Sequence, residues 1–527
     1  MKGPQQYFLL AVCSAIGWLS SCQQQPINKE DVRDEVIYHV FQRSFFDSNN
    51  DQHGDLPGLQ QKLDYLQDLG VTSILLTPLY ESVYYHNYYS SDFEKIDSTY
   101  GSKDEYLGLV KELHRRGMKL YMDMETQYVT EDHQWYKDSY GNPKSAFSDY
   151  LLYDDKAQLK PSSIVFDLYD LKGFDGKRKK ITTVNLLNKE VIKYNKELFS
   201  YWLDPNKDGN FEDGVDGFRL DHMMDDLDNK GRLTNLFRDF WAPLIDTLKG
   251  INPKIHIMAE QADWGSYGID YLTKAKVDWV FAFRIQQAIR SMDKEKITAY
   301  ADTTFRDTPK GNNQIVFIEN HDIPRFSTAV KQDKGKEKVG ASLNLLIGGV
   351  PSIYYGQEIG MLGDSFFGKY GGITDANEIP YREAFEWKKD KDSPGMAYWY
   401  KNSGPWWDTS TVKSNDGISV EEQESDPNSL LSTYKNLLKL RKAYPVLING
   451  SYQSFPNDHP SIVSFLRENG KEKAMILINL SPEATTLQIP VDKQQATLIY
   501  GENTGSTKQG KQEINIQGYQ TQVWLLK

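Results

Sequence analysis

The stretch Val215-Asp-Gly-Phe-Arg-Leu-Asp221 places an acidic side chain at the C-terminal end of a short apolar run. Two later runs end in the same way: IHIMAE ends at Glu260, and IVFIENHD ends at Asp322. Parallel α/β barrels carry their catalytic residues at the C-terminal ends of their strands, and paired carboxylates are suited to breaking glycosidic bonds. The pattern therefore predicts a barrel enzyme whose active site contains these three acids.

Segments with strand and helix patterns alternate on both sides of this stretch. Apolar, β-branched runs at 36–41, 71–77 and 118–123 are separated by helical patterns at 59–69 and 105–116. Such alternation favours βα units and a parallel sheet. With further strands ending near Asp221, Glu260, Phe281, Asn320 and Tyr355, the sequence predicts a (β/α)8 TIM barrel.

Two regions break the alternation and divide the chain into domains. Residues 127–183 lack clear periodicity and predict a small inserted domain after the third strand, so the barrel is expected over 30–126 and 184–443. Residues 444–527 alternate short apolar runs with turns, which predicts a C-terminal β-sandwich domain. An irregular stretch at 360–427 contains four tryptophans, and the cluster at 399–407 either forms outer sugar subsites or fixes the loop to the barrel.

The first 22 residues have the pattern of a bacterial lipoprotein signal. Lys2 precedes an apolar stretch at 7–19, and Leu19-Ser-Ser-Cys22 is typical of a lipobox. We therefore expect Cys22 to carry the lipid, on an exported protein that is anchored by this group alone and sorted to the outer membrane. An uncleaved N-terminal anchor helix is the alternative. The other cysteine, Cys13, lies inside the cleaved segment, so no disulfide is expected.

The charge balance limits the class of partner. A formal net charge of −12 argues against nucleic acid and anionic membrane surfaces, because both call for basic patches. A neutral substrate fits this composition.

Several motifs in the same order resemble the α-amylase family of retaining glycoside hydrolases, from about residue 36 to the C-terminus. The matching segments are VIYHVFQRSFFDSNNDQHGDL, LDYLQDLGVTSILLTPLYES, DGFRLD, the glutamate ending IMAE, ENHDIPR and GGVPSIYYGQEIGM. The resemblance implies Asp221 as nucleophile, Glu260 as general acid/base and Asp322 as transition-state stabiliser. It also implies that Arg219 holds the nucleophile, that His321 contacts the sugar and that Tyr88 stacks on it.

Physical chemistry is consistent with these roles. Retention requires two carboxyl groups about 5 Å apart, one ionised and one protonated. At an effective dielectric constant of about 20, a like charge at that distance contributes roughly 3 kcal/mol. We therefore expect the charge of Asp221 to raise the pKa of Glu260 by about two units, while Arg219 keeps Asp221 ionised.

The sequence departs from the family in two places. Asp123 is present on the third strand, but Gln127 and Tyr128 stand where the family has Asn and His, so Tyr128 is expected beside the sugar's primary hydroxyl. After the nucleophile, the residues 222–225 replace the Lys-His pair of starch endo-amylases. These changes put substrate specificity in question more than catalysis.

Hard oxygen ligands alternate in DSNNDQHGD, a spacing that suits Ca²⁺. The expected ligands are Asp47, Asn49, Asp51, the His53 carbonyl and Asp55, in a structural role. DPNKDGNFED (204–213) resembles the opening of an EF-hand loop but has Val215 at the position of the last ligand, so both a second metal and a polar turn are possible.

The sequence predicts a retaining hydrolase that cleaves α-1,4-glucosidic bonds in starch, maltodextrins or maltooligosaccharides. The alternatives are a transglycosylase on the same scaffold, which shares the glycosyl-enzyme intermediate, and an α-glucosidase or neopullulanase-type enzyme. A glycan-binding relative without catalysis is a further alternative, disfavoured because all three acids are retained.

Overall fold

The computed structural model describes residues 34–163, 168–365, 368–370, 372–489, 496–503, 507–508 and 511–526. Residues 1–33, with the predicted signal segment and Cys22, lie outside this description. Within the described ranges, no helix combines the length and apolar character needed to cross a membrane.

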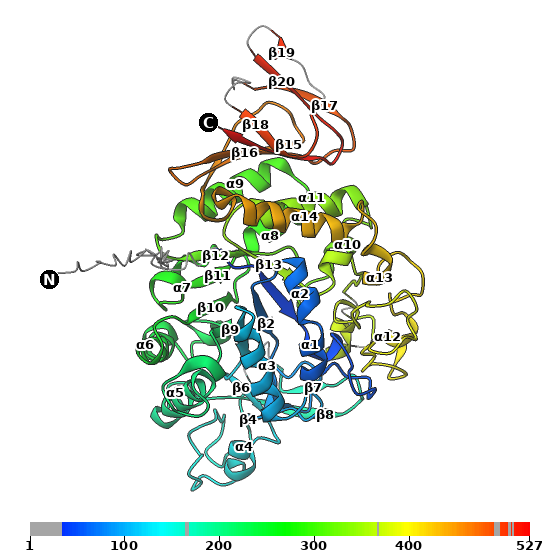
Figure 1. Ribbon diagram of the computed structural model, residues 1–527. Helices are drawn as coiled ribbons and strands as arrows, with labels where there is room; N and C mark the ends of the chain where they lie inside the picture. The colour runs from blue at the N-terminus through cyan, green and yellow to red at the C-terminus, as the bar shows by residue number, and fades with distance from the viewer. Residues whose placement is uncertain are drawn as a thin grey trace, which may run out of the picture.

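Eight parallel strands among the described residues close into a barrel, as the sequence predicts (Figure 1). β1 pairs with β2 on one side and with β13 on the other, which completes the closure. Around the barrel their order is β1-β13-β12-β11-β10-β9-β5-β2. The bounds are β1 (Ile37–Val40), β2 (Ser73–Leu76), β5 (Lys119–Met124), β9 (Gly217–Met223), β10 (His256–Gln261), β11 (Trp279–Phe281), β12 (Asn313–Val316) and β13 (Val350–Tyr354).

Helices cover the outside of the barrel. In α3, Tyr106, Leu109 and Leu113 share the buried face, and a capping box between Ser102 and Glu105 starts the helix. The pattern at 59–69 forms two helices rather than one, because the backbone leaves the helical region at Lys62 (φ −100°, ψ 4°). The surrounding helices are α1 (Leu56–Gln61), α2 (Leu63–Leu69), α3 (Lys103–Arg115), α5 (Lys189–Leu203), α6 (Ala242–Ile251), α7 (Ile269–Thr273), α8 (Phe283–Ser291), α9 (Lys294–Asp307), α10 (Phe326–Ala329), α11 (Lys334–Leu346), α14 (Leu430–Ala443) and α15 (Pro445–Asn449).

The core has two layers. Large apolar side chains that include Ile37, Tyr121, Trp279 and Phe281 fill the inside of the barrel. A larger cluster lies between the strands and the helices, because successive strand residues point to opposite faces. The packed interior supports the charged side chains that stand at the C-terminal end of the barrel.

A separate sheet projects from the C-terminal ends of the barrel strands, at the lower end of the view in Figure 1. Its order is β3-β4-β6-β8-β7, from β3 (Tyr80–Ser82), β4 (Ser90–Ile96), β6 (Tyr128–Thr130), β7 (Asp170–Lys172) and β8 (Arg178–Thr183), and α4 (Gln134–Ser139) follows β6. We call it the inserted sheet. It extends beyond the segment 127–183, since β3 and β4 come from the loop after β2.

The tryptophan-rich segment after β13 packs onto the barrel. Trp387 donates to the carbonyl of Phe45 at 2.6 Å, and Trp399 donates to the hydroxyl of Ser44 at 2.8 Å and stacks on Tyr85. These contacts support the alternative in which the tryptophans fix the loop. The segment contains η8 (Asp375–Tyr381), α12 (Pro405–Asp408) and α13 (Val420–Gln423).

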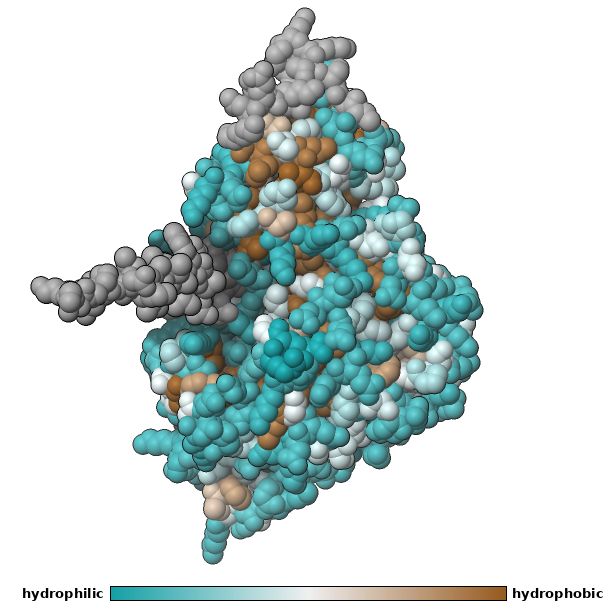
Figure 2. Space-filling view, viewed as in Figure 1, coloured by the Kyte–Doolittle hydropathy of each residue, from teal (hydrophilic) through white to brown (hydrophobic). Residues whose placement is uncertain are grey.

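Two antiparallel sheets form the C-terminal domain at the opposite end of the view (Figure 1). Hydrophobic residues of both sheets meet in one cluster that includes Leu477, Ile514 and Trp524, as expected for a β-sandwich. Figure 2 shows hydrophobic residues gathered on this domain, whereas the barrel face turned to the viewer is largely hydrophilic. The strands are β14 (Ser451–Ser454), β15 (Ile462–Glu468), β16 (Lys473–Asn479), β18 (Ala496–Tyr500) and β21 (Thr521–Leu526) in one sheet, and β17 (Thr485–Ile489), β19 (Thr507–Lys508) and β20 (Lys511–Ile516) in the other.

Candidate active site

A cavity of about 640 Å³ opens at the C-terminal ends of the barrel strands. All three predicted acids, Asp221, Glu260 and Asp322, line it. Other parts of the wall come from the loop after β2, from β6 and β7 of the inserted sheet, and from η8, so segments distant in sequence converge here.

Arg219 lies at the floor of this site and is shared by three carboxylates. Its Nη1 lies 2.6 Å from Asp123 Oδ2 and 2.7 Å from Asp221 Oδ1, and its Nη2 lies 3.1 Å from Glu260 Oε2. Asp123 and Arg219 are register partners on β5 and β9, and strand alternation turns both inward. One fixed positive charge therefore compensates only part of the negative charge around it.

A β-bulge brings an extra residue of β9 to the cavity. The register between β9 and β10 shifts after Leu220, so Asp221 and His222 together lie opposite Glu260. His222 adopts φ +44°, a conformation rare for residues other than glycine. Gln127 donates its side-chain N–H to the Asp221 carbonyl at 2.7 Å and so supports the backbone at the bulge.

Glu260 has the surroundings of a general acid. Burial, opposed by Arg219 and reinforced by the charge of Asp221, raises the pKa of Glu260 to about 7, and the two acids share a hydrogen bond. Burial is the leading cause of this rise, and the charge of Asp221 adds to it in the expected direction. The Trp264 indole N–H lies 3.3 Å from Glu260 Oε1, and the His222 amide donates to Oε2 at 3.2 Å.

Burial also raises the pKa of Asp221, and Arg219 is the main influence that lowers it. The expected contact between Arg219 and this acid is present, but the pKa remains above its ordinary value because burial outweighs the ion pair.

Asp322 lies beyond the end of β12, in the loop that follows it. Arg382, which follows η8, places Nη2 3.1 Å from Asp322 Oδ1 and 2.7 Å from Glu378. Burial and the charge of Glu260 raise the pKa of Asp322 to about 7, and Arg382 opposes them.

Tyr88 joins two of the predicted sugar contacts. Its hydroxyl donates to Asp123 Oδ2 at 2.7 Å and lies 2.6 Å from His321 Nε2, and its ring stacks on His321 with centroids 5.2 Å apart. His321 Nε2 also lies 3.1 Å from Asp322. Burial lowers the pKa of His321 well below its ordinary value, so the imidazole is neutral.

Tyr128 also lines the cavity, from β6 of the inserted sheet. Its side chain is almost completely buried, and its hydroxyl donates to Asp228 Oδ2 at 2.7 Å. Its hydroxyl is thus held by a carboxylate of the loop after β9.

The predicted calcium loop is well ordered by its own side chains. Asp47 accepts hydrogen bonds from the amides of Asn50 and Gln52, and Asp51 accepts from the amide of His53. Asp55 caps α1 by accepting from Gly58. Each carboxylate oxygen keeps further lone pairs, so the donor set remains suited to Ca²⁺.

The second loop, at 204–213, has a similar local structure. Asp204 accepts from the amides of Asp208 and Gly209, and Asn206 donates to Asp213 Oδ2 at 2.7 Å. Asp213 is buried, and its Oδ1 has no hydrogen-bond partner within the described part of the chain.

In the described residues, one group of acidic and histidine side chains is close enough to share a metal, namely Asp123, Asp221 and His321. The guanidinium of Arg219 already contacts both aspartates, so the positive charge of Arg219 compensates part of the negative charge of this cluster.

Sequence reasoning missed several residues of the cavity. Trp264 contacts Glu260 from four residues further along the chain, Arg382 contacts Asp322 from a distant segment, and Glu125 is buried in the cavity wall. Glu125 lies two residues after Asp123 on a strand end, so strand alternation was a signal for it. Arg382 lies in the irregular stretch, where no local pattern marks it.

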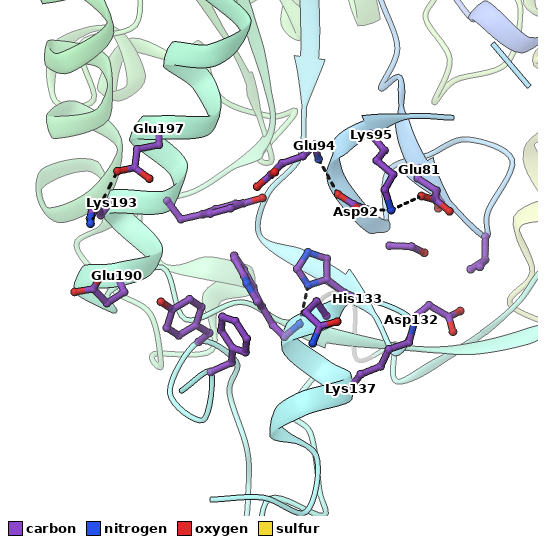
Figure 3. Close-up of a pocket in the computed structure, with 18 residues that line it drawn as sticks. Glu81, Asp92, Glu94, Lys95, Asp132, His133, Lys137, Glu190, Lys193 and Glu197 are labelled. Atoms are coloured by element: carbon purple, nitrogen blue, oxygen red, sulfur yellow. Dashed lines mark hydrogen bonds and ion pairs between the residues drawn. The ribbon is translucent and has the colours of Figure 1, made fainter. Parts of the chain in front are cut away.

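A second cavity of about 800 Å³ lies between the inserted sheet and α5 (Figure 3). We call it the outer cavity. Trp135 packs edge-on between Tyr150 and Tyr194, with ring centroids 5.2 and 4.9 Å away. Lys95 lies 2.8 Å from Asp92 and 3.6 Å from Glu81.

Comparison with known proteins agrees with this geometry. The sequence matches the family "Alpha amylase, catalytic domain" over residues 39–450 and "Alpha-amylase SusG C-terminal domain" over 462–523. Alpha-amylase 3 of Dictyoglomus thermophilum is 27% identical over 509 residues, 94% of each chain. An oligo-1,6-glucosidase of Parageobacillus thermoglucosidasius is 26% identical over 94% of this chain and 99% of its own.

Solved structures give the same result. The crystal structure of an alpha-amylase from H. orenii has a TM-score of 0.77 and 25% identity, over 93% of this chain and 99% of that chain. The catalytic-domain match covers well over half of the sequence. The chain therefore belongs to the α-amylase family of glycoside hydrolases and transglycosylases.

Proposed function

We propose that this protein is a retaining α-glucan hydrolase that cleaves α-1,4-glucosidic bonds of starch, maltodextrins or related oligosaccharides. The observation that carries the proposal is the pair Asp221 and Glu260, which share a hydrogen bond in one cavity with Arg219 bound to both. Carboxyl groups this close leave no space for a water molecule between them, which favours double displacement over inversion.

In the first step, Glu260 in its protonated form donates its proton to the glycosidic oxygen while Asp221 attacks the anomeric carbon. The bond to the leaving sugar breaks, and a glycosyl ester on Asp221 forms. Glu260, now ionised, then takes a proton from water, and the resulting hydroxide attacks the ester and releases the sugar with its configuration retained. The pKa of about 7 at Glu260 suits both proton transfers near neutral pH.

Asp322 is assigned to stabilising the transition state, with Arg382 and His321 holding it in place. Asp123, Tyr88 and His321 form one hydrogen-bonded group beside the nucleophile, and their polar atoms suit the hydroxyls of a bound sugar. Tyr128 lines the wall on the side of the inserted sheet.

Products distinguish this activity from its alternatives. The purified protein should release maltooligosaccharides from amylose, and NMR of the first products should show the α-anomer. New, longer glucans or trehalose at high maltooligosaccharide concentration would instead indicate a transglycosylase. Cleavage of isomaltose without cleavage of amylose would indicate a glucosidase acting on α-1,6 bonds. Inversion of the anomer would contradict the mechanism.

We further propose that Ca²⁺ binds the loop 47–55 and contributes stability rather than chemistry. Asp47, Asn49, Asp51, the His53 carbonyl and Asp55 would hold the ion, and none of these residues lines the catalytic cavity. A ligand that binds only the folded state raises the melting temperature, so chelation should lower Tm by several degrees.

Metal content per chain tests this assignment. Asp47→Asn should lose the ion bound at the first loop. If the loop 204–213 also binds an ion, Asp213→Asn should lose that second ion. Turnover well below Tm should change little in Asp47→Asn. An unchanged Tm after exhaustive chelation, with no metal co-purified, would contradict the calcium proposal.

We also propose that Cys22 carries a lipid that anchors the exported protein to the outer membrane. The motif Leu19-Ser-Ser-Cys22 supports this. Labelled palmitate should be incorporated by the natural chain and not by Cys22→Ala. Incorporation into Cys22→Ala would contradict the assignment.

A further inference from the structure

Asp228 links two walls of the catalytic cavity through a single carboxylate. Its Oδ1 lies 2.9 Å from His222 Nε2 on β9, and its Oδ2 accepts the hydroxyl proton of Tyr128 on β6 at 2.7 Å. Its side chain is 7% exposed, and that of His222 is 14% exposed. Both oxygens of this nearly buried carboxylate therefore contact residues that line the cavity.

The bulge explains why His222 lies at this place. In a regular strand the residue after Asp221 would point away from the cavity, but here Asp221 and His222 together face Glu260. The backbone of His222 (φ +44°) and that of Asp228 (φ +52°) both lie in the left-handed region. Strained backbone of this kind persists where surrounding contacts hold it, and it is concentrated at functional sites.

The two partners of Asp228 occupy the positions where the sequence departs from its family. Tyr128 stands in place of a histidine, and His222 begins the segment that replaces the usual Lys-His pair. In the structure, Asp228 contacts both Tyr128 and His222. The two departures from the family therefore belong to one hydrogen-bonded group.

We propose that Asp228 is a positioning residue that holds His222 as an imidazolium beside Glu260. The positive charge of His222 adjusts the acid strength of Glu260, and it shapes the part of the site that receives the leaving or the accepting sugar. The proposal rests on the proposed function, since it assigns Glu260 the role of acid. Glu260 is the group next to His222 that transfers a proton, and the His222 amide donates to its Oε2.

The charges around His222 support this arrangement. Asp228 faces it from the loop after β9, Asp221 precedes it on the strand, and Glu260 faces it from β10, while Tyr128 packs 6.2 Å from its ring. Burial lowers the pKa of His222, but the hydrogen bond and charge of Asp228, together with the charges of Asp221 and Glu260, leave the pKa raised. In turn, the charge of His222 lowers the pKa of Glu260.

Asp228→Asn is the central variant, because the amide has the size of the carboxylate and removes only its charge. His222 then loses the hydrogen bond and the negative charge of Asp228 that favour its protonated form, and we expect the pKa of Glu260 to rise as His222 gives up its proton. We expect the alkaline limb of the kcat/KM profile on maltooligosaccharides to move upward by roughly half a pH unit or more. His222→Gln should move the limb in the same direction, and the double variant should move it no further than Asp228→Asn does.

Tyr128→Phe is the matched control. It removes one hydrogen bond to Asp228 and keeps the negative charge, so KM is expected to change while the alkaline limb stays in place. Circular dichroism and Tm confirm that each variant folds. The proposal would be overturned if the alkaline limb did not move in folded Asp228→Asn. It would also be overturned if the shift in the double variant equalled the sum of the shifts in Asp228→Asn and His222→Gln. Failure of the proposed function shows separately, as full activity in Asp221→Asn.

Discussion

The catalytic cavity and the outer cavity share the inserted sheet as part of their walls, and both contain aromatic and acidic side chains. The outer cavity is the larger, at about 800 against 640 Å³. Its acids are at least partly hydrated, with side-chain exposures from 29% for Asp132 to 68% for Glu197. In the catalytic cavity, Glu260 is 7% exposed and Asp221 is 14% exposed.

The difference lies in how the charges are compensated. In the outer cavity Lys95 pairs with Asp92 and Glu81 in contact with water, where ion pairs are worth about 0–1 kcal/mol (Figure 3). In the catalytic cavity Arg219 serves three buried carboxylates, so burial raises the pKa of Glu260 to about 7. The reactive cavity is therefore identified by buried carboxylates whose negative charge is only partly compensated, and not by its volume.

The largest expected effect separates the two cavities directly. Asp221→Asn should lower kcat on amylose by more than about a thousandfold, because the amide cannot form the glycosyl ester. The matched change in the outer cavity, Asp92→Asn, should stay within about twofold. Activity of Asp221→Asn above a thousandth of the natural level would place the nucleophile elsewhere.

A smaller but still large effect is expected from Arg382→Gln. Asp322 and Glu378 lose their shared cation, which leaves two neighbouring negative charges uncompensated beside the reacting groups. We expect kcat/KM to fall by about 30- to 100-fold, together with a lower Tm. Lys95→Gln removes the corresponding cation from the outer cavity and should change kcat/KM by less than about twofold. Equal effects of the two variants would remove the distinction between the cavities.

The pH profile sharpens the same comparison. Glu260 acts as an acid and must be protonated, and its pKa is raised to about 7. Activity should therefore decline as pH rises through about 7, approaching tenfold per pH unit above it. Glu81→Gln, in the outer cavity, should leave this limb in place. A limb at a pH near the ordinary value for glutamate would show that Glu260 is not desolvated in solution.

The smallest effect is expected at the aromatic group of the outer cavity. Tyr194→Leu removes a ring that packs on Trp135 and should change kcat/KM on both maltotriose and amylose by less than about twofold. A tenfold rise of KM for amylose alone would instead make the outer cavity a binding site for long glucans, and would break the comparison.

Much of the candidate site could be predicted because its signals are local. Asp221, Glu260 and Asp123 follow apolar runs, and strand alternation turns them to the inside of the barrel together with Arg219. The barrel itself follows from alternating strand and helix periodicities. The β-bulge was not predictable, since nothing in the letters around His222 marks a shifted register.

Contacts between distant segments could not be predicted. Arg382 reaches Asp322 from the irregular stretch after β13, 60 residues further along the chain. The role of Trp399 could not be decided from the sequence either, because it depends on the hydrogen bond of Trp399 to Ser44 in the loop after β1. Each of these contacts depends on how loops pack, which has no periodic signature.

The sequence by itself determined the barrel, the C-terminal sandwich and the acids at the strand ends, because short-range periodicity decides which residues point inward. Only the tertiary structure decided how strong those acids are and which residues hold them. Desolvation, the sharing of Arg219 and the link from Tyr128 through Asp228 to His222 arise where segments far apart in sequence exclude water together.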